Sequence, residues 1–322
     1  MLSYKSGIKY IKKVVDGADY ESCSVPGFRF SDYTTYGLGG GVSKAYFPRN
    51  FPEARKVYDE LAMRKNLSRD DKTERACSGD FFIFANGSNV LASDGFFKGE
   101  VLCTRRLRGI MRTGKNQLFC AAGTPVSHLL NYCLKYGLGG LEYLYGIPAT
   151  IGGITYMNGG AGGRYISSNV VSVSLYDGKN FSLSNENCKF GYKYSTMRDI
   201  NALILGTYLS VSTSSRTETE ERLNYYKSLR RGHPKGRSCG CVFKNPEGLS
   251  AGKLIQDCNL SGLSVGGAHV SDKHCNFIIN DGATAEQVRT LIRIVSDRVF
   301  AATGIRLEEE VVYIGDFDDF NG

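Results

Sequence analysis

Residues 237–248 read RSCGCVFKNPEG and place two thiols, Cys239 and Cys241, one residue apart, with a lysine and an asparagine close behind. Thiols at such a spacing serve as metal ligands, as a disulfide, or as acids and nucleophiles. The ten cysteines include no C-x-x-C pair and no accompanying H-x-x-x-H, so we expect no metal site. Most of them are predicted to be small hydrophobic residues of the core, as Cys133 is in the apolar helical pattern LLNYCLKYGL.

Glycine gathers in three separate clusters, among them GLGGG at 37–41 and the stretch 139–163, each beside an apolar, strand-like run. Such glycines either make turns between strands or let backbone N–H groups approach a pyrophosphate that side chains would hold off. Three clusters favour a phosphate cradle. None of them opens a helix as the fingerprint G-x-G-x-x-G does, so a doubly wound nucleotide fold is not expected. Glycine is dense enough in 139–163 to predict no regular helix there.

The composition sets limits on the class of protein. A chain of 322 residues, 42% of them hydrophobic, is long enough for two or three domains and predicts a soluble globular protein. The net charge of +8 comes from dispersed basic residues without a dense tract, which favours small anionic ligands over nucleic acid. No apolar run is long enough to span a bilayer, and lysines interrupt the first fifteen residues, unlike an export signal. We therefore expect a cytoplasmic protein without a membrane partner.

The spacing of apolar residues predicts the elements that position these groups. Residues 51–68 and 125–138 carry the pattern of amphipathic helices. The run FFIFANGSNVLAS, 81–93, is typical of a strand that ends in a tight turn at 86–89. The first helix and this strand are separated by a charged loop.

The last third of the chain begins after the polar, charged segment 213–232, which is predicted to become helical. Near its end, Thr284 and Gln287 form a capping box for a helix over 285–304. One face of that helix is apolar, with Val288, Leu291, Ile292, Val295 and Val299. It is predicted to be scaffold.

Several blocks in the chain occur together and in order: TTYGLGG, NGSNVLASDG, GLEYLYGIPATIGGITYMNGGAGG, GCVFKNP, AGKLI, VSDKHCNFIIN and LEEEVVYIG. In these blocks, from about Thr34 to Gly315, the chain resembles the UDP-N-acetylenolpyruvoylglucosamine reductases, flavoenzymes that complete the muramic acid unit of bacterial peptidoglycan. The direct step from the central region into RRGHPKGRSCGC resembles the shorter subtype of that family.

The resemblance implies an α+β fold: a two-part FAD-binding region of the vanillyl-alcohol-oxidase (PCMH) type and a C-terminal α+β substrate-binding domain. The expected divisions are 1–98, including an N-terminal helix, then 99–212, and then 213–322. It also implies FAD as cofactor, NADPH as hydride donor and a UDP-sugar substrate, and it leaves the oligomeric state open. The residues that match the segments holding FAD are Gly87, Ser88, Asn89, Gly146, Ile147, Pro148, Thr150, Gly152 and Gly153.

Three residues match the catalytic motifs of the family. In GCVFKNP, Cys241 occupies the position at which the motif G-S-x-F-K-N-P has a serine, and the resemblance implies that this residue is the proton donor. Glu310 matches the carboxylate of L-x-x-E-V. Lys193, in FGYKYS, replaces the arginine of G-Y-R-x-S. A thiol is more acidic than an alcohol, whereas lysine lacks the planar two-pronged contact that suits a carboxylate. For the substrate, Asn245 resembles a diphosphate contact, and Lys244 adds charge beside it.

Plainer interpretations stay open beside these. Cys239 and Cys241 are otherwise buried loop cysteines, and Lys193 is otherwise a surface residue whose role Arg164 or Arg198 takes over. Glu308 and Glu309 are predicted to form a solvated acidic edge, and His274 is predicted to be structural.

Replacement of the expected serine and arginine also motivates a second hypothesis, a noncatalytic or regulatory paralogue that binds FAD or a UDP-sugar. A third is a sugar or lactone oxidase on the same flavin fold, against which the C-terminal blocks speak.

Overall fold

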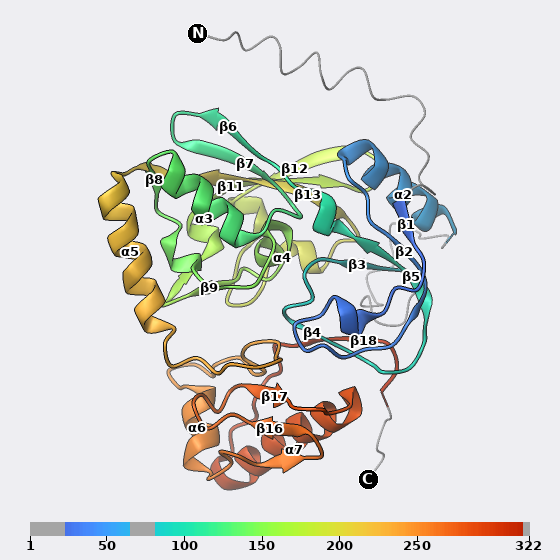
Figure 1. The fold of residues 1–322 in the computed structure, drawn as a ribbon, viewed down its shortest axis with the longest axis vertical. Helices are drawn as coiled ribbons and strands as arrows, with labels where there is room; N and C mark the ends of the chain where they lie inside the picture. The colour runs from blue at the N-terminus through green and yellow to red at the C-terminus, as the bar shows by residue number, and fades with distance from the viewer. Residues whose placement is uncertain (1–22, 65–80, 318–322) are drawn as a thin grey trace.

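The computed structural model of the protein describes residues 23–64 and 81–317. The expected N-terminal helix falls within residues 1–22, outside the described part of the chain, as do Cys77 and the charged loop that follows the first helix. Figure 1 shows two sheet-containing units side by side above a smaller C-terminal unit. None of the helices within the described ranges is both long and apolar enough to cross a bilayer.

The first unit is built on a four-stranded sheet in the order β1-β2-β5-β3. Its strands are β1 (Ser24–Val25), β2 (Val42–Tyr46), β3 (Phe81–Phe84) and β5 (Phe97–Cys103). β5 runs parallel to both of its neighbours. Helix α2 (Phe51–Arg64) packs its apolar face, with Val57 and Leu61, into a core that includes Leu102. A division after residue 98 would cut β5, so we propose that this unit runs to Cys103.

The second unit contains a five-stranded antiparallel sheet in the order β12-β11-β13-β7-β6. Its strands are β6 (Ile110–Gly114), β7 (Gln117–Ala121), β11 (Val170–Tyr176), β12 (Asn180–Ser184) and β13 (Leu203–Ser210). Helix α3 (Val126–Lys135) packs on this sheet with Leu129 and Cys133 buried, which confirms the predicted helix and the apolar environment of Cys133.

The prediction that the glycine-rich stretch forms no regular helix is wrong for residues 151–156. Helix α4 (Ile151–Tyr156) contains Gly152 and Gly153, and its first turn is capped by Thr150, whose Oγ1 accepts from the Gly153 N–H at 3.4 Å. The cost of glycine in a helix is offset here by close packing. A Cβ on Gly152 would lie 2.9 Å from the Cβ of Ala122, so only glycine lets the helix approach β7 this closely.

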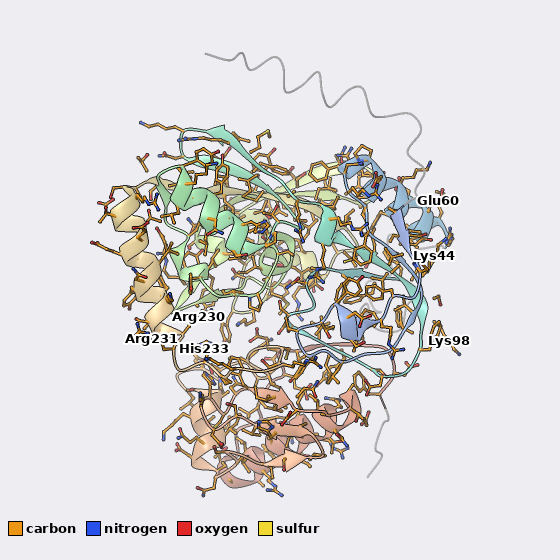
Figure 2. The ribbon with its side chains drawn as sticks, in the orientation of Figure 1. Lys44, Glu60, Lys98, Arg230, Arg231 and His233 are labelled. Atoms are coloured by element: carbon orange, nitrogen blue, oxygen red, sulfur yellow. The ribbon has the colours of Figure 1, made fainter. Side chains whose placement is uncertain are left out.

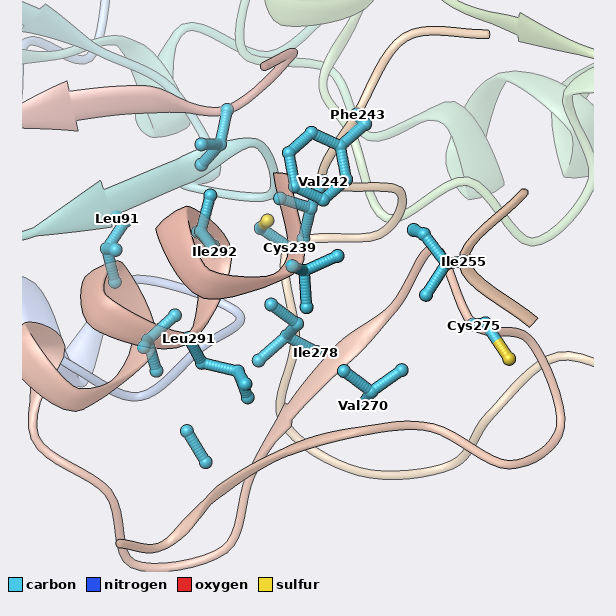
Figure 3. Packing of buried hydrophobic residues seen from close by; sticks show 14 of the residues in the cluster. Leu91, Cys239, Val242, Phe243, Ile255, Val270, Cys275, Ile278, Leu291 and Ile292 are labelled. Atoms are coloured by element: carbon cyan, nitrogen blue, oxygen red, sulfur yellow. The ribbon is translucent and has the colours of Figure 1, made fainter. Parts of the chain in front are cut away.

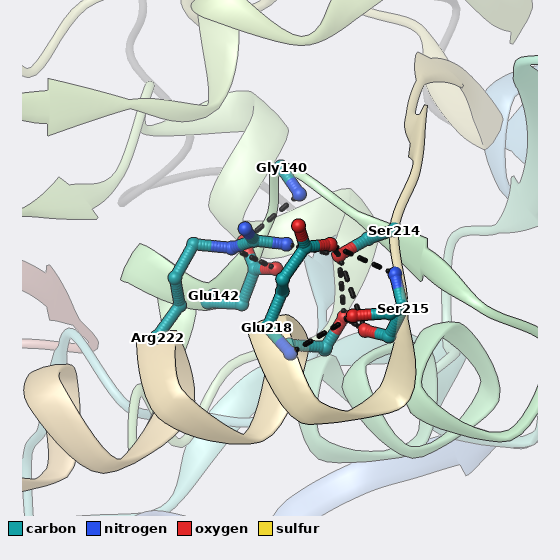
Figure 4. A network of polar contacts seen from close by, with 7 residues as sticks. Gly140, Glu142, Ser214, Ser215, Glu218 and Arg222 are labelled. Atoms are coloured by element: carbon teal, nitrogen blue, oxygen red, sulfur yellow. Dashed lines mark hydrogen bonds and ion pairs between the residues drawn. The ribbon is translucent and has the colours of Figure 1, made fainter.

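Helix α5 (Arg216–Leu229) confirms the prediction that the polar segment becomes helical. It begins with a capping box of Ser215 and Glu218, and Arg222 on its next turn pairs with the buried Glu142 at 2.9 Å (Figure 4). Because Leu223 and Tyr226 pack against the second unit, α5 belongs to that unit's core. We therefore propose that the compact C-terminal unit starts after α5, beyond the expected boundary at 213.

The C-terminal unit packs helices α6 (Ala251–Asp257) and α7 (Ala285–Thr303) against a small antiparallel sheet. The strands of that sheet are β15 (Ser264–Val265), β16 (Ala268–Val270) and β17 (Ile278–Asn280). The capping box at Thr284 and Gln287 and the buried apolar face of α7 are both confirmed. Its core also takes in Tyr36 and Leu91 from the first unit, and Figure 3 shows Leu91 among the buried side chains beside α7.

Short strand pairs complete the fold. They are β4 (Val90–Ala92) with β18 (Val312–Ile314), β8 (Leu138–Gly139) with β14 (Ser212–Thr213), and β9 (Gly160–Ala161) with β10 (Arg164–Tyr165). The pairing of β4 with β18 is parallel and brings the end of the chain back to the first unit. The nine described cysteines are free thiols, and all except Cys241 and Cys258 are buried, which confirms that most of them are core residues.

Candidate active site

The loop that carries Cys241 is held rigidly by one buried side chain. Asn276 accepts from the Phe243 N–H through Oδ1 at 2.9 Å and donates from Nδ2 to the Phe243 carbonyl at 2.8 Å. Val242 and Phe243 are buried in the core of the C-terminal unit (Figure 3). Cys241, on the preceding position, is only half-buried. Alternation along this extended segment therefore turns the side chain of Cys241 away from that of Val242.

Glu310 lies directly beside this loop. Its N–H donates to the carbonyl of Val242 at 2.7 Å, which joins the two segments backbone to backbone. Its carboxylate, only 9% exposed, forms an ion pair with the Lys193 ammonium at 2.8 Å. The three residues that match the family motifs thus come together, although they are far apart in the sequence.

Lys193 is not the surface residue that the plainer interpretation of it predicted. It is 18% exposed and adopts a left-handed backbone conformation, φ 56°, in a tight turn. Arg198 donates to the Lys193 carbonyl at 2.8 Å, and the Tyr192 hydroxyl accepts from the Asn245 N–H at 3.0 Å. Arg198 thus supports the Lys193 turn, whereas Arg164 is exposed and lies over the ring of Tyr143.

Burial and, to a smaller extent, the neighbouring Glu310 carboxylate together raise the pKa of the Cys241 thiol to about 11, although Lys193 and Arg230 oppose the shift. At neutral pH the sulfur therefore keeps its proton. Burial works against the charge of Lys193, but the Glu310 carboxylate outweighs it, so the pKa of Lys193 is raised and the ammonium stays charged.

Arg230 is the residue of this site that sequence reasoning missed. It caps the C-terminus of α5 and donates to the Gly146 carbonyl at 3.2 Å, and its charge acts on Cys241. Figure 2 places Arg230 where the chain leaves α5 for the C-terminal unit, close to Arg231 and His233. The signal was available in the basic run RRGHPKGR that leads into the two cysteines.

Cys239 belongs to the core. It is 3% exposed and packs among buried apolar side chains (Figure 3). It also lies close to the hydroxyl of Tyr36. Burial raises the pKa of its thiol to about 12. The plainer interpretation thus fits Cys239, and the two neighbouring thiols have different environments.

The nine residues predicted to hold FAD lie on two adjoining segments. Asn86 donates to the Pro148 carbonyl at 2.7 Å and so ties the turn at 86–89 to the segment 146–153. Gly87 has φ 60°, and a Cβ there would lie 2.7 Å from the ring of Phe84, so the turn requires glycine. Two adjoining segments that contain glycine fit a pyrophosphate-bearing cofactor such as FAD, because glycine sets no side chain between the backbone and the phosphates.

The residues expected at the substrate are partly engaged within the protein. Lys244 pairs with Glu308, which is 71% exposed, and the Asn245 Oδ1 accepts from the Ala251 N–H at the start of α6 at 3.0 Å. The solvated edge predicted for Glu308 is confirmed. For Glu309 it is wrong, because that carboxylate pairs with Arg289 at 3.0 Å.

Comparisons with known proteins match both ends of this arrangement. Residues 75–180 match the model of an FAD binding domain, and residues 233–314 match that of the UDP-N-acetylenolpyruvoylglucosamine reductase C-terminal domain. The reductase of that name from Borrelia garinii subsp. bavariensis is 34% identical over 296 residues, 88% of this chain and 91% of its own. The chain belongs to the UDP-N-acetylenolpyruvoylglucosamine reductase family.

Other members of the reductase family are similar to this chain over most of its length. The reductase of a Synechococcus species is 38% identical over 245 residues, covering 74% of this chain and 78% of its own. The crystal structure of the Thermus caldophilus reductase superposes with a TM-score of 0.73 at 30% identity, covering 90% of this chain and 98% of the other. The resemblance and the α+β flavoprotein fold are thereby confirmed, and the chain is an FAD-containing oxidoreductase.

Proposed function

We propose that this protein uses NADPH to reduce UDP-N-acetylglucosamine enolpyruvate to UDP-N-acetylmuramate, in the cytoplasmic synthesis of peptidoglycan precursors. The observation that carries the proposal is the Lys193–Glu310 ion pair set beside the protonated thiol of Cys241. Reduction of an enolpyruvyl group needs a proton donor and cations at the carbon and carboxylate where negative charge develops. The family to which the chain belongs carries out this reaction, which supports the proposal.

Each group of the site has a distinct task. FAD, held by the two glycine-containing segments, supplies the hydride when bound. Cys241 gives the proton: its S–H bond breaks, a C–H bond forms, and the electron pair stays on sulfur. The resulting thiolate faces the charges of Lys193 and Arg230, which stabilise the anion. Glu310 orients Lys193 through their ion pair and so helps to stabilise the enol-like intermediate.

We assign Lys244 and Asn245 to the substrate diphosphate. Lys244 is paired only with a highly exposed carboxylate, so a diphosphate can replace Glu308 as its partner. The backbone of Asn245 is fixed by Tyr192, on the residue next to Lys193. Substrate binding and the ion pair are thus mechanically linked.

A noncatalytic paralogue is the second candidate, favoured by the replacement of the family's serine and arginine by Cys241 and Lys193. Stopped-flow mixing of the FAD-loaded protein with NADPH, and then with the enolpyruvyl substrate, separates the two. We expect the flavin absorbance to bleach and then to return with substrate. Bleaching without a substrate-driven return would sink the reductase and leave the paralogue. FAD released by acid precipitation would speak against a covalent-flavin oxidase.

A further inference from the structure

Asn89 lies in the segment that the motif match assigns to the cofactor, but its side-chain amide is bonded to Glu310, and we do not count it among the groups that hold FAD. Its Nδ2 donates to the backbone carbonyl of Glu310 at 2.9 Å, and its own carbonyl accepts from the Val312 N–H at 3.0 Å. These two hydrogen bonds bind the backbone on both sides of Val311. The partners are separated by 221 residues in sequence, so the contact exists only in the folded protein.

These two hydrogen bonds lie at the beginning of the parallel pairing between β4 and β18. The register in the β4–β18 ladder (Figure 1) sets Val90 opposite Val312 and Ala92 opposite Ile314, so Asn89 directly precedes the first pair of the ladder. Residues 308–310 lie before the start of β18 and are not part of the ladder.

Glu310 is held at three points. Its N–H is bound to Val242, its carbonyl to Asn89, and its carboxylate to Lys193. The first contact comes from the loop of Cys241 and the third from the second unit. The second contact comes from the glycine turn 86–89, which Asn86 ties to the other flavin segment. The glycine turn is thereby bonded directly to the backbone of Glu310.

We propose that Asn89 is a positioning residue for Glu310, and that its amide couples the order of the glycine turn to the placement of the carboxylate. The inference rests on the proposed function, which gives Glu310 its task. When a catalytic group is misplaced by up to about 1 Å, the rate of the step that it assists can fall by on the order of tenfold to hundredfold. The backbone carbonyl of Glu310 needs a donor, and Asn89 is the side chain that supplies it.

Asn89→Asp is the informative variant because it keeps the size of the side chain, removes the Nδ2 donor and sets a carboxylate against a carbonyl. Asn89→Ala removes the donor without adding charge. The matched control is Asp94→Ala, which also removes a hydrogen bond between the first and the C-terminal units, the one that the Ala285 N–H donates to Asp94 Oδ2 at 2.6 Å. That bond ends on α7, away from Glu310.

The first readout needs neither cofactor nor turnover. Hydrogen exchange followed by mass spectrometry, on the peptide that spans residues 310–314, reports the amides of Glu310 and Val312. We expect exchange there to be at least about tenfold faster in Asn89→Asp than in the unmodified protein, and unchanged in Asp94→Ala. Equal exchange in Asn89→Asp and the unmodified protein would show that Asn89 does not hold this segment.

The second readout uses FAD-loaded protein with flavin content matched by absorbance. We expect Asn89→Asp and Asn89→Ala to reoxidise on substrate roughly ten to a hundred times more slowly, with flavin reduction by NADPH and the substrate KM within about twofold. Equal slowing of both half-reactions, or the same loss in Asp94→Ala, would reduce Asn89 to a structural tie. If the unmodified protein itself is not reoxidised, the proposed function fails, and the exchange result still decides the positioning.

Discussion

At the scale of single residues, the site differs from the family motifs in two chemically related ways, a thiol for an alcohol and an ammonium for a guanidinium. Cys241 and Lys193 are both desolvated, and both interact with Glu310. A thiol releases its proton more readily than an alcohol, and the anion that it leaves is stabilised by any nearby cation. The thiol can therefore offset part of what the loss of the planar arginine contact costs.

Replacement of Cys241 tests its role as the acid. We expect Cys241→Ala to leave flavin reduction by NADPH nearly intact and to slow the substrate-dependent half-reaction by about 10²- to 10⁴-fold, the range typical of general acids. Cys241→Ser should restore much of the rate. Stopped-flow absorbance separates the two half-reactions. An equal loss in both of them would count against the assignment.

The pH profile provides a separate check on Cys241. A donor works while it is protonated, and burial raises the pKa of this thiol to about 11. The substrate-dependent rate, divided by the fraction of protein that is folded at each pH, should therefore stay level from neutral pH to about pH 10 and fall above it. In Cys241→Ser this alkaline fall should disappear, because an alcohol keeps its proton throughout. A profile that falls near pH 8.5, where an unperturbed thiol titrates, would show that Cys241 is not desolvated.

Lys193→Met removes one partner of a buried ion pair. It leaves the Glu310 carboxylate without its cation, which typically costs about 3–5 kcal/mol in the free energy of unfolding. Urea denaturation measures this loss. The double variant Lys193→Met with Glu310→Gln should regain a large part of the stability while its substrate-dependent rate stays low. Additive losses in stability in the double variant would mean that the two groups are not coupled.

At the scale of elements, the active site depends on short pieces of chain whose positions are set by glycine and by hydrogen bonds between units. Helix α4 is one such piece, since Gly152 faces Ala122 while Gly153 faces Ala85. The position of the segment that is predicted to hold the cofactor therefore depends on how α4 packs against the second unit. Its six residues are too few to be stable as an isolated helix, so packing decides its structure.

The neighbouring glycines of α4 form a matched pair for a test. A Cβ on Gly152 would lie 2.9 Å from the Ala122 Cβ and 3.1 Å from the Ala122 carbonyl, so Gly152→Ala should destabilise by about 1–3 kcal/mol through overpacking. A Cβ on Gly153 would lie 3.5 Å from its nearest neighbours, an ordinary contact, so Gly153→Ala should be neutral or stabilise by up to about 1 kcal/mol. Thermal unfolding of both variants decides. The reverse order would contradict this packing.

At the scale of the whole molecule, buried thiols make the fold sensitive to alkali. Burial raises the pKa of Cys23 and Cys188 to about 11 and that of Cys103 and Cys133 to about 12. The ordinary pKa of a thiol is 9.0, so near this pH the unfolded chain starts to release protons that the folded chain keeps. Their contribution to stability is therefore complete below pH 9 and is lost as the pH rises toward 11–12.

This sign predicts a steep alkaline loss of stability. Each such thiol costs about 1.4 kcal/mol per pH unit above 9. Urea midpoints, measured under reducing conditions, should be level from pH 6 to 8 and fall sharply between pH 9 and 10.5. Cys133→Val, which removes one buried thiol, should make the fall shallower by about that amount. A level midpoint up to pH 10.5 would contradict the burial of these thiols.

Sequence patterns determined much of this protein because they report local physics. Thr284 and Gln287 form the capping box that their spacing predicts, and the apolar face of α7 is buried as its period requires. Motif blocks identified the family, and with it the approximate positions of Cys241, Glu310 and the two glycine segments. These features depend on residues that are close together in the chain or on strings of residues that can be matched directly.

Tertiary structure decided which of these groups meet. No local rule reveals that the turn of Lys193 faces Glu310, that Arg230 at the end of α5 acts on Cys241, or that Asn89 holds the carbonyl of Glu310. Nor could glycine content show that α4 is helical, since Ala122, the group that requires Gly152, lies on another segment. Helical periods and caps follow from contacts a few residues apart, whereas desolvation, ion pairing and close packing depend on which distant segments the fold brings together.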